Sequence, residues 1–190
     1  MIPAGYLYKR IESKPDGLQA RGVSDIYSLS GCVSKDFADY INFWKHNGYW
    51  LFDTALAMEK IARDEGIDLS ETTLVYYEAY EYEFDDQTGK WSAFAPEPSF
   101  LTRVQEPLDR HLKGLDVTTF SGHTSAECSP LSCNDLAETI PVNRHCLFDT
   151  FAEAKKALEQ GLFKNSEPGP FRIFAVYTVH SSLTDDAGIA

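Results

Sequence analysis

The sequence has few basic residues and no long apolar run. Lys and Arg number 17 against 29 Asp and Glu, which gives a formal net charge of −12. Proteins that bind nucleic-acid phosphates or anionic membranes need clustered Lys and Arg, so both partner classes are excluded. No stretch approaches the ~18 apolar residues that span a bilayer, and the start, MIPAGYLYKRIESKPDG, lacks the apolar core of a secretion signal. We therefore expect a cytoplasmic protein.

Cysteine is scarce, and its spacing is loose. The four cysteines are Cys32, Cys128, Cys133 and Cys146. Without a secretion signal they are expected to be free thiols rather than disulfides. Structural zinc usually shows tight C-x2-C pairs, which this sequence lacks. The H-x4-C-x4-C spacing of His123, Cys128 and Cys133 leaves zinc as an alternative, but we expect no metal and no cofactor.

Apolar residues are plentiful enough for an ordinary core. The chain has 190 residues, of which 43% are hydrophobic and 13% aromatic, so it can fold without disulfide or metal support. The last ten residues, SSLTDDAGIA, have no apolar period. We therefore expect one globular domain over residues 1–180 and a flexible tail over 181–190.

One sequence pattern occurs twice in the chain. Residues 47–54 and 143–150 share N-x-x-x-L-F-D-T, and each precedes a helical pattern. Upstream, residues 25–31 (DIYSLSG) and 116–122 (DVTTFSG) share D-x-x-x-x-S-G, which is typical of a strand ended by a turn. These matches indicate an internal duplication. The alternative is that two ordinary units look alike because strands and helix caps use few residue types.

Cap signals define the helices of each copy. Ser34 and Ser129 precede one helical run in each copy, and Pro130 suits a first helical position. Thr54 and Thr150 suit the N-cap of a second helix, which is expected to end near Gly66 in the first copy and Gly161 in the second.

Each copy then runs into a strand, so the element order in each half is β-α-β-α-β. The strands carry Tyr, Ser, Thr and Glu, which disfavours an all-parallel buried sheet. We therefore predict an α+β fold, with a mixed sheet built from two pseudo-repeated halves plus an N-terminal strand and a central hairpin. The expected ranges are 25–84 and 116–179 for the halves, 73–84 and 171–179 for their last strands, 5–12 for the N-terminal strand and 81–94 for the hairpin.

Three residues of the second copy suggest a nucleophilic site. If the strands of one copy run parallel, Cys133, His123 and Asp149 share the edge where α/β folds place their sites. Cys133 would be the nucleophile at a helix N-terminus, His123 its base, and Asp149 the group that orients the imidazole. The structural alternative is that Cys133 is a small buried apolar side chain and Asp149 belongs to the helix start, because Asp53 recurs without a neighbouring histidine.

The two S-G turns suggest a ligand site. Backbone N–H groups at a glycine turn before a helix can hold an anion, and this assigns ligand binding to Ser30, Gly31, Ser121, Gly122 and Ser129. One glycine per loop falls far short of a phosphate-binding motif. The structural alternative is that each glycine only permits a tight turn.

The function predicted from these features is that of a binding or regulatory protein. A cleft between two similar halves would take a small molecule or a protein partner. One alternative is a hydrolase or transferase that uses Cys133 and His123, and the sequence leaves open whether the protein is an enzyme. Another is an acidic decoy that docks on a basic protein.

Overall fold

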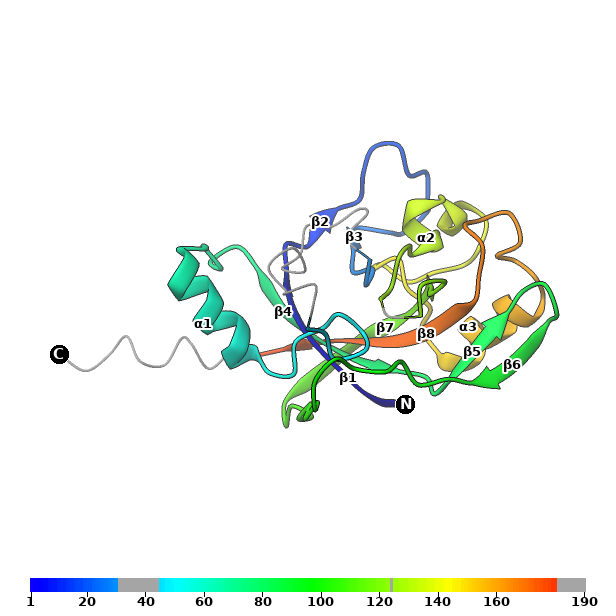
Figure 1. Cartoon of the computed structure of the whole chain (residues 1–190). Helices are drawn as coiled ribbons and strands as arrows, with labels where there is room; N and C mark the ends of the chain where they lie inside the picture. The colour runs from blue at the N-terminus through cyan, green and yellow to red at the C-terminus, as the bar shows by residue number, and fades with distance from the viewer. Residues whose placement is uncertain (31–44, 124, 181–190) are drawn as a thin grey trace.

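The computed structural model describes residues 1–30, 45–123 and 125–180, and Figure 1 shows how they are arranged. Strands make up most of the regular structure, and the helices are short. In chain order the elements are β1 (Ile2–Lys9), β2 (Glu12–Ser13), β3 (Asp25–Ile26), α1 (Ala55–Glu65), β4 (Thr73–Ala79), β5 (Tyr82–Asp85), β6 (Lys90–Ala93), β7 (Arg110–Thr119), α2 (Pro130–Cys133), the 3-10 helix η2 (Leu136–Glu138), α3 (Phe151–Glu159) and β8 (Phe171–Val179).

The main sheet has six strands, and all its pairings are antiparallel. Strand β8 lies at its centre and pairs with β7 along its whole length on one edge. On its other edge β8 pairs with β5 at its start, through Phe171 and Phe84, and with β4 over residues 174–178. Strand β1 extends the sheet beyond β4, and β6 extends it beyond β5. In Figure 1 the helices α1 and α3 lie at opposite sides of these strands.

The prediction of a mixed sheet made from two β-α-β-α-β halves is wrong. Antiparallel neighbours do not need the helical crossovers that parallel strands require. The helix expected after Ser129 is the four-residue α2, and the one expected after Ser34 lies outside the described residues, as does the tail 181–190. The match between residues 25–31 and 116–122 is also misleading, because β3 has two residues and pairs with β2 in a separate sheet, whereas residues 116–119 end the ten-residue β7.

The N-x-x-x-L-F-D-T pattern nevertheless has the same local structure at both places. The side-chain amide of Asn47 donates to the carbonyl of Ala4 in β1 at 2.8 Å, and that of Asn143 donates to the carbonyl of Lys113 in β7 at 2.7 Å. Each asparagine oxygen accepts backbone N–H groups from the second and fourth residues after it. The repeated asparagine therefore fastens the loop before each helix to a strand.

The phenylalanine of each repeat completes that attachment. Phe52 forms an isolated antiparallel bridge with Tyr6 in β1, and Phe148 forms one with Leu115 in β7. Strands β1 and β7 therefore hold corresponding positions. The N-terminal strand, expected as an addition to the first copy, is the counterpart of β7.

The corresponding parts meet at the middle of the sheet. Gly5 pairs with Tyr77, and Gly114 pairs with Val176, each at a register shift of the outer strand. Tyr77 and Val176 in turn pair with each other across β4 and β8. This symmetric register relates β1 and β4 to β7 and β8, so the two similar parts are joined by backbone hydrogen bonds.

Some predictions that rest on local signals are confirmed and others are wrong. The strand predicted over 73–84 is divided, because β4 ends at Ala79 and β5 begins at Tyr82, and Ser129 makes no side-chain cap hydrogen bond at the start of α2. Thr54 caps α1 by accepting from Ala57, and Thr150 forms a capping box with Glu153. Gly66 ends α1 in the left-handed conformation, with φ of 69°. Strand β8 has the predicted bounds, and β5 and β6 form a hairpin within residues 81–94.

Two apolar clusters lie under the helices. Met58 and Ala62 of α1 pack with residues of β1 and β4, whereas Ala154 and Leu158 of α3 pack with residues of β7 and β8. Within the described ranges, no helix combines the length and the apolar content needed to cross a bilayer.

Candidate functional site

Three residues predicted to belong to a site lie together around a buried carboxylate. The hydroxyl of Ser129 donates to Asp116 at 2.6 Å and accepts the backbone N–H of Ser30 at 3.2 Å. The hydroxyl of Ser30 lies 3.5 Å from the sulfur of Cys133. We call Lys9, Ser30, Asp116, Ser129 and Cys133 the Asp116 cluster. It joins the end of β1, the middle of β7 and the start of α2.

Asp116 is the central group of this cluster, and its side chain has no contact with solvent. Burial raises the pKa of Asp116 to about 6, because a carboxylate loses its hydration there. Hydrogen bonds from Ser129 and from the backbone N–H of Leu29, at 2.7 Å, and the positive charge of Lys9 act in the opposite direction. The carboxylate is therefore poised to change its charge in mildly acidic solution.

Lys9 and Asp116 hold the same short segment of the chain. The buried ammonium of Lys9 donates to the carbonyl oxygens of Ser28, Leu29 and Ser30, at 2.5, 3.0 and 3.5 Å. Asp116 accepts the N–H of Leu29 from the other side. Because Lys9 comes from β1 and Asp116 from β7, residues 28–30 bridge the first strands of the two similar parts.

A hollow opens beside the cluster. It has a volume of about 530 Å³, within the range of small-molecule sites. Cys133 is only partly buried, and it belongs both to the cluster and to the wall of this hollow. We call it the α2 hollow, and it is lined by Thr119, Ser121, Glu127, Cys128, Ser132, Cys133, Asn134, Glu167 and Pro168.

The anion-binding turn predicted at Ser121 and Gly122 already holds a carboxylate of the chain. Glu127 accepts the N–H of Gly122 at 2.6 Å, the N–H of Ser121 at 3.2 Å and the Ser121 hydroxyl at 2.5 Å. These donors are therefore engaged within the protein. Gly31, predicted to bind a ligand together with Ser30, lies outside the described residues.

The other two residues of the predicted nucleophilic site have different surroundings. The Nδ1 atom of His123 lies 3.6 Å from Glu83, and its ring packs against Phe94 with centroids 4.7 Å apart. Asp149 is exposed, directly before the cap of α3. Cys133 lies beside Ser30 instead. The prediction that Cys133, His123 and Asp149 share one edge of the sheet assumed parallel strands, whereas β7 is antiparallel to β8. The catalytic assignment therefore has no geometric support and stays a prediction.

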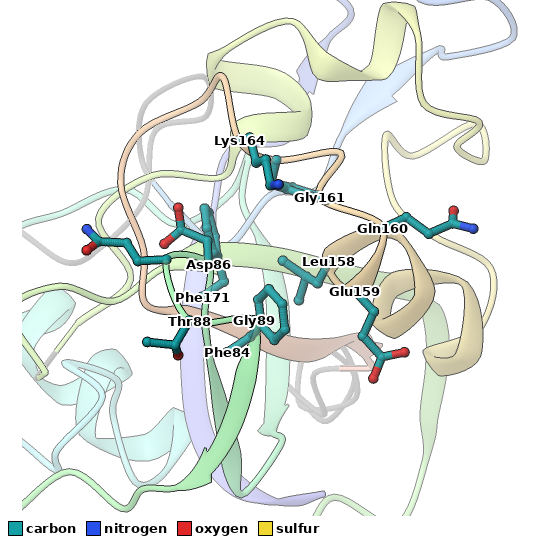
Figure 2. Close-up of a pocket in the computed structure, with 12 residues that line it drawn as sticks. Phe84, Asp86, Thr88, Gly89, Leu158, Glu159, Gln160, Gly161, Lys164 and Phe171 are labelled. Atoms are coloured by element: carbon teal, nitrogen blue, oxygen red, sulfur yellow. The ribbon is translucent and has the colours of Figure 1, made fainter.

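A second, smaller hollow lies between the β5–β6 turn and the end of α3 (Figure 2). Its volume is about 280 Å³, and Phe84, Leu158 and Phe171 form its apolar part. Polar residues of the turn and of the segment after α3, such as Asp86 and Lys164, surround them. It contains none of the predicted site residues. The α2 hollow is larger and adjoins the Asp116 cluster, so it is the stronger candidate.

Comparison with family models, with curated proteins and with solved structures gives no match. The function must therefore be argued from the α2 hollow and the Asp116 cluster.

The thiols of the described residues are expected to differ strongly in reactivity. Burial raises the pKa of Cys146 to about 12 from an ordinary 9.0, so its thiolate is about a thousandfold scarcer in mildly basic solution. Cys133 opens to the α2 hollow, whereas Cys146 is 1% exposed. Alkylation of the native protein with iodoacetamide, followed by peptide mass mapping, should modify Cys133 at least a hundredfold faster than Cys146.

The same experiment in urea is the control, because unfolding should make the two rates similar. Equal rates in the native protein would contradict the burial of Cys146. A rate at Cys133 well above that of the unfolded chain would favour the nucleophilic alternative, and a rate at or below it would favour a binding role.

Proposed function

We propose that this protein binds a small polar molecule in the α2 hollow. The observation that carries the proposal is an open cavity of about 530 Å³ whose walls offer hydroxyl, carboxylate, amide and thiol groups. The volume lies within the range of small-molecule sites, and the lining is more polar than that of most such sites, which favours a polar ligand. The cavity is formed by the end of β7, α2 and the turn before β8, so the proposed site lies within the second of the two similar parts.

The charges around the α2 hollow favour a neutral or cationic ligand. Of the described residues that line it, Glu127 and Glu167 are acidic and none is Lys, Arg or His. The turn donors that would attract an anion are engaged by Glu127. The formal net charge of −12 adds a field of the same sign. A ligand rich in hydroxyl or amine donors fits these walls better than a phosphate or carboxylate.

A cytoplasmic location belongs to the same proposal. Cys146, which is buried, forms no disulfide. Free thiols persist in reducing compartments, which supports this location.

The binding proposal predicts a response confined to one place on the protein. Amide chemical shifts of the labelled chain are followed while glucosamine, ethanolamine, glycerol and, as anionic controls, acetate and phosphate are added. The cationic or neutral probes are expected to shift the amides of Ser121, Glu127 and Asn134 at concentrations of about a millimolar or below. The anions are expected to leave these amides unchanged.

A blocked variant and a matched control sharpen the test. Ser121→Trp places an indole at the wall of the α2 hollow and is expected to weaken binding about tenfold or more. Ser99→Trp replaces another exposed, hydrogen-bonded serine that does not line the hollow, so it should bind as the natural chain does. The proposal fails if no probe shifts these amides, if the anions bind best, or if Ser121→Trp binds normally.

A further inference from the structure

The structure assigns a divalent transition-metal site, for which Zn²⁺ is the fitting ion, to the cluster of Asp109, His111 and His180. One ligand atom from each side chain lies within 4.8 Å of the others. The Nε2 atom of His111 is 3.6 Å from the Asp109 carboxylate, and the two imidazole rings have centroids 5.2 Å apart. In the described part of the chain this is the one group of three such donors, and His123, Cys128 and Cys133 do not form another. The assignment is independent of the α2 hollow.

The sheet register brings these donors together. Arg110 pairs with Val179 and His111 with Thr178, so Asp109 is opposite His180 one step further along the two strands. Residues directly opposite in an antiparallel pair, and residues two apart in one strand, point to the same face. Asp109, His111 and His180 therefore share one face at the start of β7 and the end of β8.

The geometry suits a metal with few ligands. Around a tetrahedral Zn²⁺ with bonds of about 2.1 Å, neighbouring ligand atoms lie about 3.4 Å apart. The 3.6 Å separation between His111 and Asp109 is close to this value. All three side chains are exposed, so His180 can turn to complete the set without disturbing the core. Two imidazoles and a carboxylate favour Zn²⁺ over Mg²⁺ or Ca²⁺, and the fourth position remains for water.

The positive charge that is adjacent in the chain is directed away from the cluster. Arg110 lies between Asp109 and His111 in the chain, so its side chain points to the other face of the strand. There its guanidinium pairs with Glu78 at 2.7 Å and with Glu106 at 3.2 Å. Lys113 of the same strand has its ammonium 5.7 Å from the centroid of the Tyr27 ring. The donors face solvent, and the acidic chain raises the local concentration of metal ions.

The other described histidines have partners of their own. His145 contacts Asp25 at 2.5 Å, His46 stacks on Trp50, and His123 lies beside Glu83. A single histidine with one carboxylate binds Zn²⁺ more weakly than three converging donors. We therefore expect one principal Zn²⁺ per chain, joining the start of β7 to the end of β8.

Calorimetric titration of the full chain, without a histidine tag, with zinc chloride tests this assignment. One Zn²⁺ is expected to bind with a dissociation constant on the order of 10 µM near neutral pH, while Mg²⁺ does not bind measurably. His111→Ala and His180→Ala are each expected to weaken binding about tenfold or more, and the double variant to abolish the principal site.

A matched control and a second readout keep the result decisive. Leu112→Ala alters another exposed residue of β7 and should leave the affinity unchanged. Imidazole resonances of His111 and His180, but not of His46, should shift with zinc. The assignment is overturned if zinc does not bind below about a millimolar, or if the double variant binds as the natural chain does.

Discussion

Replacing Gly114 with alanine is expected to lower the free energy of unfolding by about 4 kcal/mol. The glycine has φ of +148°, which side chains of L-residues rarely adopt. An alanine Cβ would lie 2.6 Å from the carbonyl oxygen of Phe148 and 2.7 Å from the Cβ of Leu147. Both contacts belong to the attachment between the N-x-x-x-L-F-D-T loop and β7. The loop would have to separate from the strand, and the adjacent bridge between Leu115 and Phe148 would open.

Gly5→Ala should give a similar loss, because the first repeat has the same construction. Its φ is +136°, and its Cβ would lie 2.7 Å from Leu51 and 2.8 Å from the carbonyl of Phe52. Gly17→Ala is the control, since nothing lies within 4 Å of its Cβ and its φ is outside the restricted range. Its effect should stay within about 1 kcal/mol. Urea unfolding measures all three, and a loss below about 1 kcal/mol at Gly114 would show that the repeated attachment is not rigid.

The sequence predicted best what is encoded within a few neighbouring residues. The caps at Thr54 and Thr150, the hairpin of β5 and β6, and the bounds of β8 all follow from local chemistry. The doubled N-x-x-x-L-F-D-T pattern marked a real repeated structure, because its Asn, Leu, Phe and Thr make the same backbone contacts or caps at both places. Its true first strands were missed, since PAGYLY and LKGLDV share little besides one glycine.

Strand direction was the main error in the fold, and it has a physical cause. Whether two strands run parallel depends on contacts between distant residues, such as those that join Tyr77 to Val176. Alternation and cap residues do not report it. The edge argument that united Cys133, His123 and Asp149 depended on parallel strands, so it lost its basis with them.

The candidate site was predicted in part, and for reasons other than those observed. Ser30, Ser129 and Cys133 do meet, but around Asp116, which the sequence analysis did not select. A signal was present, because Asp116 lies inside the apolar and β-branched run GLDVTTF. A charged side chain within a buried strand is rarely buried unless it has a partner, so the run pointed to a paired Asp116. Glu127 had no such signal, because its binding to the Ser121–Gly122 turn depends on how the loop folds back.

The protonation of Asp116 is expected to change stability between about pH 4 and pH 7. Its pKa rises from 3.8 in the unfolded chain to about 6 in the folded one, so the folded state binds the proton more tightly. Its contribution is fully present below about pH 3.8 and is lost as pH rises through about 6. The shift corresponds to about 2 to 3 kcal/mol in the free energy of unfolding. The contribution of Asp116 makes the protein less stable at the higher pH.

The variant Asp116→Asn isolates this effect, because asparagine does not titrate. The difference in unfolding free energy between the natural chain and Asp116→Asn should move by about 2 to 3 kcal/mol in favour of the natural chain as pH falls from about 7 to 4. Asp64→Asn, at an exposed position of α1, is the control for removing one negative charge, and its difference should be nearly constant. Other groups near Asp116 are Lys9 of β1, Cys133 of α2 and Cys146 before α3. A constant difference for Asp116→Asn would contradict the raised pKa of Asp116 and would mean that solvent reaches the carboxylate.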